Sequence, residues 1–170
     1  MSETAAARSV LASYCTGMGI DIGFGGSAIT PTAITFDQPR MYCPSLEGHR
    51  QHLRGDATKL PFICDGAFDY VYSSHLVEDF YYEELIGIIT EWRRILVPRG
   101  GVLILNAPDQ KRFLDHCEAT GQSINANHKE IDFSFRHFVD RVLSVTGAWT
   151  LVYENPNVPP YSWHLVARKM

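Results

Sequence analysis

The chain has 170 residues, 45% of them hydrophobic, and a formal net charge of −4. This length and composition predict a single domain over residues 1–170 with a full-sized core, and they exclude global disorder. The acidic balance, without any long basic run, argues against a dedicated nucleic-acid binder. Four scattered cysteines without a CxxC pair argue against a disulfide framework or a zinc site.

The N-terminal residues predict a short helix rather than a targeting segment. Residues 2–14 are rich in alanine, and Ser2 or Thr4 can cap the helix. They contain no long apolar stretch, so they do not resemble a signal peptide, and no segment reaches the roughly 20 apolar residues of a membrane span. We therefore expect a reduced, cytoplasmic protein with no membrane span.

The next residues predict two short strands joined by a glycine-rich turn. "GIDIGF", residues 19–24, is an apolar run, and "TAITFD", residues 32–37, is rich in β-branched residues. The interval between them leaves room for only one or two helical turns, at residues 27–32. A parallel crossover normally needs about a dozen residues or more. We therefore expect a shortened first crossover helix.

The rest of the chain alternates between helices and strands. Residues 38–52 are predicted as a loop with a weak helix. Further strands are predicted at residues 51–57, 68–73, 101–107, 149–154 and 162–169. Further helices are predicted at residues 83–96, 110–120 and 132–147. The alternation predicts an α/β fold in three layers: a mostly parallel, seven-stranded sheet that ends in an antiparallel C-terminal hairpin.

Polar or glycine-containing segments follow the first five predicted strands. The carboxyl ends of parallel strands lie at one edge of the sheet, where ligands bind. The segments at that edge are "DIGFGGS", Asp37, "GDATKLPF", "SSHLVEDF" and "NAPD".

Four of these patterns resemble motifs of class I S-adenosylmethionine-dependent methyltransferases in order and spacing. They are the glycine loop from Asp21 to Gly26, Asp56-Ala57 with Leu60-Pro61-Phe62, the strand running to His75, and "EWRRILVPRGG" at residues 91–101. The resemblance covers roughly residues 19–105. It implies a Rossmann-like fold, S-adenosylmethionine as cofactor and methyl transfer as activity.

The resemblance also implies which residues contact the cofactor. The glycine loop would surround its methionyl part, with free N–H groups binding the carboxylate. An acid that ends the second strand would accept from the ribose hydroxyls. The implied residues are Asp21, Gly23, Phe24, Gly25 and Gly26 at the methionyl part, Asp37 with Gln38 at the ribose, Asp56 and Ala57 at the adenine, and Ser73 and Ser74 below the sulfonium.

The glycine loop also fits a dinucleotide fingerprint, because Gly23, Gly25 and Ala28 match G-x-G-x-x-A. That fingerprint needs a helix N-terminus for the pyrophosphate and a ribose acid about 20 residues further on. In this chain the corresponding acid, Asp37, follows the glycine loop sooner than that, and Pro31 interrupts the residues between them. An NAD-dependent enzyme is therefore disfavoured. A cofactor without phosphate needs no helix N-terminus for a pyrophosphate, so a short crossover weakens its binding less.

Two histidines are candidates for the general base that an O–H or N–H acceptor needs. His75 directly follows the fourth strand, and His128 lies in a stretch that resembles an acceptor-pocket segment of some family members. Asn106 and Tyr81 or Tyr82 could line the pocket. The spacing of His49 and His52 suggests a metal pair, but no further ligands lie nearby, so we expect no metal.

The acceptor stays open at this point. The amide-methylating signature "NPPY" is absent, which disfavours adenine methylation and leaves O- or N-methylation of a small molecule, glycan, lipid precursor or protein. The nearly bare fold suggests a pocket that is open, completed by a homodimer partner, or suited to part of a large substrate. The alternative is a non-catalytic binding or scaffold domain: the short crossover and missing N-terminal cap favour it, while Asp37 and Asp56 argue against it.

Overall fold

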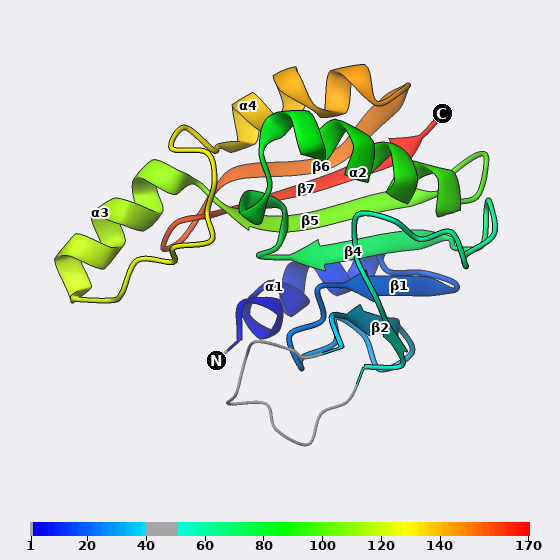
Figure 1. The fold of residues 1–170 in the computed structure, drawn as a ribbon, viewed down its shortest axis with the longest axis horizontal. Coiled ribbons are helices and arrows are strands. Elements are labelled where there is room, and N and C mark those ends of the chain that lie inside the picture. Colours follow the sequence, from blue (N-terminus) through cyan, green and yellow to red (C-terminus); the bar gives the residue numbers. More distant parts are fainter. Residues whose placement is uncertain (1, 40–50) are drawn as a thin grey trace.

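The structure is a computed structural model that describes residues 2–39 and 51–170. Within these residues, seven strands form one sheet in the order β3-β2-β1-β4-β5-β7-β6 (Figure 1). Strands β1 to β5 pair in parallel, and β7 runs antiparallel to both β5 and β6. The predicted α/β fold, with its antiparallel C-terminal strand, is confirmed.

The strands are β1 Gly19–Ile22, β2 Ile34–Asp37, β3 Leu53–Arg54, β4 Tyr70–Ser74, β5 Val102–Pro108, β6 Trp149–Val158 and β7 Ser162–Lys169. The helices are α1 Glu3–Leu11, α2 Tyr82–Ile95, α3 Gln110–Thr120 and α4 Phe135–Arg141, with short 3-10 turns η1 Ala12–Tyr14, η3 Val77–Asp79 and η4 Leu143–Val145. None of these helices is long and apolar enough to cross a membrane.

Helices cover both faces of the sheet, as Figure 1 shows. On one face, α2 and α4 bury a large core against the sheet; Trp92 and Phe138 are fully buried there. On the other face, α1 packs Ala7 and Leu11 against a smaller cluster that includes Tyr72. Helix α3 projects beyond the end of the sheet toward which β4 points.

Several predicted boundaries are wrong by a few residues. The strand predicted at residues 51–57 is only Leu53–Arg54, because Asp56 starts a turn in which its Oδ1 accepts from Thr58 N at 2.8 Å. The helix predicted at residues 132–147 begins after Ser134, one of the two caps expected for it, but it breaks after Arg141 into η4 instead of continuing to Gly147. The weak helix predicted within residues 38–52 falls mainly outside the described residues.

The link between β1 and β2 contains no helical turn. Its backbone groups bond instead to the strands and to α1. Gly23 N and Phe24 N both donate to Phe36 O, at 3.0 and 3.2 Å. Arg8 of α1 donates to the carbonyl oxygens of Ala28 and Ile29, at 2.7 and 3.3 Å. The prediction of a shortened crossover is correct, and the link is even shorter than the one or two turns expected.

Arg112 stabilises the turn between β6 and β7 through hydrogen bonds. The Arg112 guanidinium donates to four carbonyl oxygens around that turn, at 3.1 to 3.3 Å. This clamp sets the start of β7, where Ser162 faces the site described below.

Candidate active site

Two adjoining cavities open where β1, β2 and β4 end. The first has a volume of about 580 Å³ and the second about 410 Å³. They share Gly23, Asp37, Gln38 and Leu76, so together they form one groove. Their size is that of ordinary ligand pockets, which run from about 300 to 1,000 Å³.

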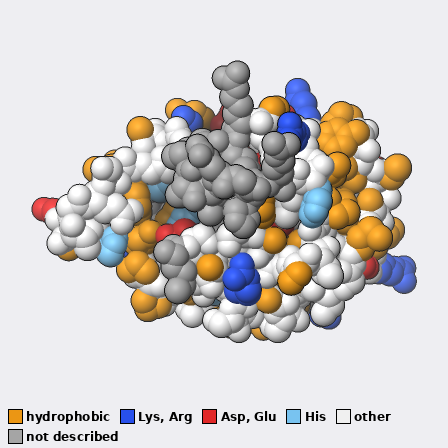
Figure 2. Space-filling view, turned by 90° about the horizontal axis from the view of Figure 1, so that it is seen from below, with side chains coloured by type: hydrophobic (Ala, Val, Ile, Leu, Met, Phe, Trp, Pro, Cys, Tyr) orange, Lys and Arg blue, Asp and Glu red, His pale blue; other side chains and the backbone are white. Residues whose placement is uncertain are grey.

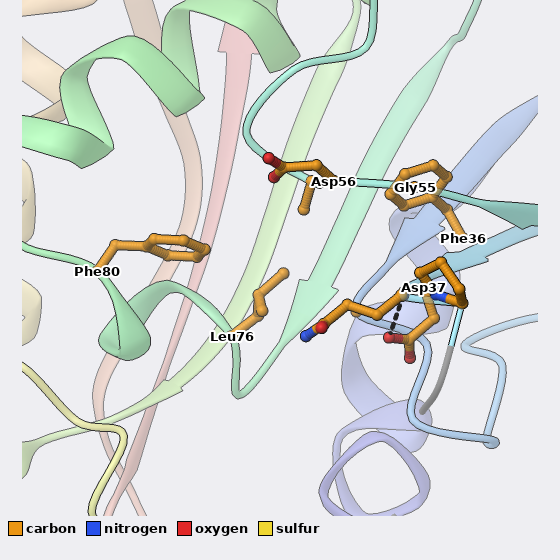
Figure 3. A pocket seen from close by; sticks show the side chains of 10 residues that line it. Phe36, Asp37, Gly55, Asp56, Leu76 and Phe80 are labelled. Atoms are coloured by element: carbon orange, nitrogen blue, oxygen red, sulfur yellow. Dashed lines mark hydrogen bonds between the residues drawn. The ribbon is translucent and has the colours of Figure 1, made fainter. Parts of the chain in front are cut away.

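The first cavity combines apolar walls with a carboxylate. Phe36 and Asp56 lie on one side of it, and Leu76 and Phe80 lie on the other (Figure 3). The hydrogen bond from Thr58 N lowers the pKa of Asp56, so this carboxylate is charged at neutral pH. Trp92 Nε1 donates to Ala57 O at 2.9 Å and holds the loop. This lining suits a flat ring that carries an amino group.

Asp37 lies at the junction of the two cavities. Its Oδ2 accepts from Gly25 N at 2.8 Å, and its Oδ1 accepts from Gln38 N at 2.7 Å. Each carboxylate oxygen has a second acceptor site. Asp37 can therefore also accept two hydroxyl hydrogens from a ligand that spans the groove.

The glycine loop approaches the β4 side closely. Gly23 has a φ of +76°, and a Cβ there would lie 2.8 Å from Leu76 Cδ2. Gly25 also has a positive φ, +53°, and lines the second cavity. Both positions have a backbone conformation that favours glycine.

The N–H groups of Gly23, Phe24 and Gly25 are not free, contrary to the prediction. Those of Gly23 and Phe24 donate to Phe36 O, and that of Gly25 donates to Asp37. Because no helix follows β1, the loop folds back onto β2 and uses these donors there. Gly26 lines a separate shallow cavity beside Arg8 instead of the groove.

Asp21 and Ser73 lie outside the groove. Asp21 is 1% exposed and faces the α1 side of the sheet, where its Oδ2 accepts from Ile29 N at 2.8 Å. Burial raises the pKa of Asp21 to about 8, although the Ile29 hydrogen bond opposes the shift. Ser73 is buried within β4 and lines neither cavity, whereas Ser74 lines the second.

The second cavity lies between the N-terminus of α1 and the segment after β4. Ser2, Glu3 and Thr4 line one part of it, and His75 and Asp79 line another. On the face shown in Figure 2, acidic and histidine side chains lie next to one another at the margin of the residues drawn in grey. Helix α1, which was expected within residues 2–14, thus contributes its cap and first turn to the wall of this cavity.

His75 is held at the wall of this cavity. Its φ of +51° is unusual for a non-glycine residue, and its N–H donates to Asn106 O at 2.8 Å. Nε2 lies 3.2 Å from Ser162 Oγ, and Nδ1 lies 3.3 Å from Glu78 Oε1. Burial lowers the pKa of His75, but the hydrogen bond to Glu78 and the charges of Glu78 and Glu3 outweigh it, so the net shift is upward.

His128 does not reach the groove. Its side chain is 4% exposed and packs on Phe113, with ring centroids 4.8 Å apart. Nδ1 lies 2.6 Å from Gln110 Oε1, and Nε2 lies 3.8 Å from Glu78 Oε1. Burial lowers the pKa of His128, so its ring is neutral at pH 7. This second candidate base lines neither cavity.

Other predicted lining residues also lie elsewhere. Asn106 is buried and donates to Ser74 Oγ at 2.9 Å, which fixes the end of β4. Tyr82 is buried and Tyr81 is exposed, and neither lines the groove. His52 Nδ1 lies 3.0 Å from Thr35 Oγ1, and His49 lies outside the described residues. Among residues 2–39 and 51–170 there is no cluster of side chains that could hold a metal.

The sequence analysis missed four lining residues that bear on function: Glu3, Leu76, Asp79 and Phe80. The last three belong to "SSHLVEDF", which was expected at this edge of the sheet as a segment, although these three residues were not singled out. Burial raises the pKa of Asp79 to about 7, with Glu78 adding to the shift. Nothing in the sequence indicated that Glu3 lies opposite them.

A family model described as a methyltransferase domain matches residues 15–104, more than half of the chain. The chain belongs to this methyltransferase family. The matched range ends within β5 and contains Asp37, Asp56 and the segment after β4. The predicted family and enzyme class are confirmed. No match was found among curated proteins.

Several solved structures share the fold of this chain. The PH0226 protein from Pyrococcus horikoshii has 22% identity and a TM-score of 0.70, covering 98% of this chain and 89% of that one. A SAM-dependent methyltransferase from Archaeoglobus fulgidus has 14% identity and a TM-score of 0.69, with 98% and 92% coverage. The 1,6-didemethyltoxoflavin-N1-methyltransferase of Burkholderia thailandensis, solved with S-adenosylhomocysteine bound, has 13% identity and a TM-score of 0.66, with 99% and 79% coverage.

Proposed function

We propose that this methyltransferase transfers the methyl group of S-adenosylmethionine to an oxygen or nitrogen of an unidentified acceptor, with His75 as general base. The observation that carries the proposal is the groove itself. Asp37 stands at its centre, an apolar cavity with Asp56 lies on one side, and His75 lines the cavity on the other side.

The lining fits the parts of the cofactor in order. Phe36, Asp56 and Ala57 would hold the adenine, and Asp37 the ribose hydroxyls. Gly23 and Gly25 would border the methionyl part in the second cavity. The bound cofactor supplies a methyl group already activated on a positively charged sulfur.

The charge of the groove supports a cationic ligand. Glu3, Asp37 and Asp79 line the second cavity, and no lysine or arginine of the described residues lines either cavity. A cleft lined by one sign of charge raises the local concentration of ligands of the opposite sign. A sulfonium therefore suits this groove better than the pyrophosphate of a dinucleotide does.

His75 would act on the acceptor. A hydroxyl must lose its proton as its oxygen bonds to the methyl carbon, and a protonated amine must lose one beforehand, because its nitrogen has no free electron pair. The electron pair of the broken carbon–sulfur bond would stay on the sulfur, and His75 would take the proton. Only the neutral imidazole can do so. Because the carboxylates around His75 raise its pKa, transfer should increase as the pH rises through that pKa.

The alternative proposal is a binding or scaffold domain of the same fold without catalysis. It is favoured by the occupied N–H groups of residues 23–25, which leave the methionyl carboxylate fewer backbone partners. Such a domain could still bind the cofactor, and it would fail to transfer a methyl group to any acceptor.

Calorimetric titration with S-adenosylhomocysteine tests the proposal first. The wild-type protein should bind, and Asp37→Asn should weaken binding at least about tenfold, because hydrogen bonds to charged groups contribute about 1.5–3 kcal/mol. Asp115→Asn, at an exposed carboxylate paired with Lys111 in α3, is the matched control and should bind normally. No binding to the wild-type protein at millimolar ligand would refute the proposal.

The base is tested with labelled cofactor. The wild-type protein is incubated with S-adenosylmethionine that carries a radiolabelled methyl group and with a pool of compounds that contain hydroxyl and amine groups. At least one compound of the pool should become labelled. His75→Gln should bind S-adenosylhomocysteine yet transfer about 100-fold more slowly or worse, the usual loss for a general base. Equal transfer by His75→Gln would show that another group takes the proton.

A further inference from the structure

We infer that Glu78 is the positioning residue for His75: it holds the Nδ1–H of the imidazole and leaves Nε2 on the groove side as the proton acceptor. This inference rests on the proposed function, because it assigns the means by which the proposed base is oriented. Glu78 itself lines neither cavity.

Glu78 bridges the two histidines from a buried position. It belongs to η3, is 1% exposed, and points Oε1 at His75 Nδ1, 3.3 Å away. The same oxygen lies 3.8 Å from His128 Nε2, on the far side from the groove. Glu78 O also accepts from Lys129 N at 3.0 Å, so the His128 segment is tied to η3 by the main chain as well. His128 is thus placed to support Glu78 and not to meet an acceptor.

The chemistry of a carboxylate decides the tautomer of His75. An ionised carboxylate accepts hydrogen bonds and donates none, and Glu78 lies nearer to Nδ1, at 3.3 Å, than Glu3 lies to Nε2, at 3.6 Å, so the hydrogen of a neutral His75 is favoured on Nδ1. Nε2 then carries the lone pair. Nε2 lies 3.2 Å from Ser162 Oγ and 3.6 Å from Oε2 of Glu3, which lines the second cavity. A carboxylate behind a histidine acts in this way in other enzymes, where it fixes the orientation and the tautomer.

Two energetically unfavourable features at Glu78 and His75 support a functional role for this pair. Glu78 Oε2 is buried and has no hydrogen-bond partner in the described part of the chain. His75, three residues earlier, has a left-handed backbone conformation with φ of +51°. Unsatisfied buried groups and strained backbone both reduce stability, and they concentrate at functional sites. Packing alone would favour an apolar residue in place of Glu78.

Other ionisable groups also face His75. Glu3 comes from α1, Asp79 from η3, and Tyr161 and His164 lie on the β7 side. The Tyr161 hydroxyl donates to Glu3 Oε1 at 2.8 Å. Burial lowers the pKa of His164 to about 4, so it stays neutral near pH 7. Of the carboxylates, Glu78 is the one that lies against Nδ1, and its removal should therefore alter the tautomer as well as the pKa.

Nitrogen NMR of the full chain with ¹⁵N-labelled histidine tests this inference without any acceptor. The His75 signals are assigned as those lost in His75→Gln. In the wild-type protein, neutral His75 should carry its hydrogen on Nδ1. Glu78→Gln removes the charge and should lower the His75 pKa by about one unit or more, a tenfold change in proton affinity. Glu78→Leu also removes the acceptor, and should shift the tautomer toward Nε2–H.

Matched controls separate this role from a general effect. Glu83→Gln removes an exposed carboxylate in the first turn of α2 and should leave the His75 signals unchanged. Both Glu78 variants should bind S-adenosylhomocysteine as the wild-type protein does, because Glu78 lines neither cavity. Thermal unfolding establishes that each variant is folded.

Two results would overturn the inference. One is a wild-type His75 whose neutral form carries its hydrogen on Nε2, which decides the question even if the variants do not fold. The other is a folded Glu78→Leu or Glu78→Gln protein with an unchanged tautomer and pKa. Failure of the wild-type protein to bind S-adenosylhomocysteine would instead overturn the proposed function and leave the NMR result standing.

Discussion

Replacing Asp21 by asparagine should make the protein more stable at neutral pH and leave it unchanged in acid. Asp21 is buried beneath the sheet, one oxygen accepts from Ile29 N, and Oδ1 has no partner among the described residues. Burial raises its pKa to about 8, from its ordinary value of 3.8. The folded protein therefore keeps a proton that the unfolded chain has already released at pH 7. Asparagine can keep the bond to Ile29 and carries no charge to bury.

The sign and size follow from proton binding. Between the unfolded and folded pKa values the native state holds one more proton, so the free energy of unfolding falls by about 1.4 kcal/mol per pH unit. From pH 4 to pH 7 this amounts to about 4 kcal/mol, an upper value because buried sites relax when they ionise. Below the pKa that Asp21 has in the unfolded chain, Asp21 is protonated in both states and does not reduce the free energy of unfolding.

Urea unfolding at a series of pH values measures this effect. The difference in unfolding free energy between Asp21→Asn and wild type should be near zero at pH 4 and grow steadily up to pH 8. Asp115→Asn, at an exposed position, should not show this growth. If the free energies of unfolding of Asp21→Asn and wild type changed with pH in parallel from pH 4 to pH 8, the reasoning would be refuted. Unimpaired binding of S-adenosylhomocysteine by Asp21→Asn would further indicate that Asp21 supports the fold and not the ligand.

Three further predictions concern the glycine loop, the hairpin clamp and the groove. Gly23→Ala should lower the free energy of unfolding in urea by about 1–3 kcal/mol, because the φ of Gly23 is positive and the new Cβ would contact Leu76. Gly87→Ala is the control: this glycine lies in α2 with open space around it, so the substitution should raise the free energy of unfolding by up to about 1 kcal/mol. Arg112→Met should lower the free energy of unfolding by about 2–4 kcal/mol, since four carbonyl oxygens lose a charged donor; a change below about 0.5 kcal/mol would contradict the clamp. Burial raises the pKa of Asp79 to about 7, so its ionisation above that pH should increase the affinity for S-adenosylmethionine relative to S-adenosylhomocysteine, whose sulfur carries no charge. Calorimetry of Asp79→Asn should show no such pH dependence.

The parts of the fold that local patterns determine could be predicted from the sequence. Helix α2 was expected at residues 83–96 and spans Tyr82–Ile95, because its apolar residues recur at helical spacing. Asp37 ends β2 and reaches the groove, as expected of a polar residue at the carboxyl end of a parallel strand. Helix α4 was overestimated because its last turns carry apolar residues that suit η4 equally well.

The parts of the site that depend on distant contacts could not be predicted. The position of Glu3 follows from the packing of α1 on the sheet, and no local pattern indicates which edge a terminal helix approaches. The use of the N–H groups of residues 23–25 depends on how the loop folds back onto Phe36. The orientation of Asp21 was available in principle, since side chains alternate along a strand and Ile20 and Ile22 face the α2 side.

The position of α1 has a practical consequence for protein production. Ser2 both caps α1, accepting from Ala5 N at 3.1 Å, and lines the second cavity. An affinity tag fused ahead of it would begin at the wall of the proposed active site and could compete with an acceptor for entry. The other terminus lies far from that wall, beyond β7 (Figure 1), and Met170 is 65% exposed. Purification handles for screening acceptors therefore belong at the carboxyl end of the chain.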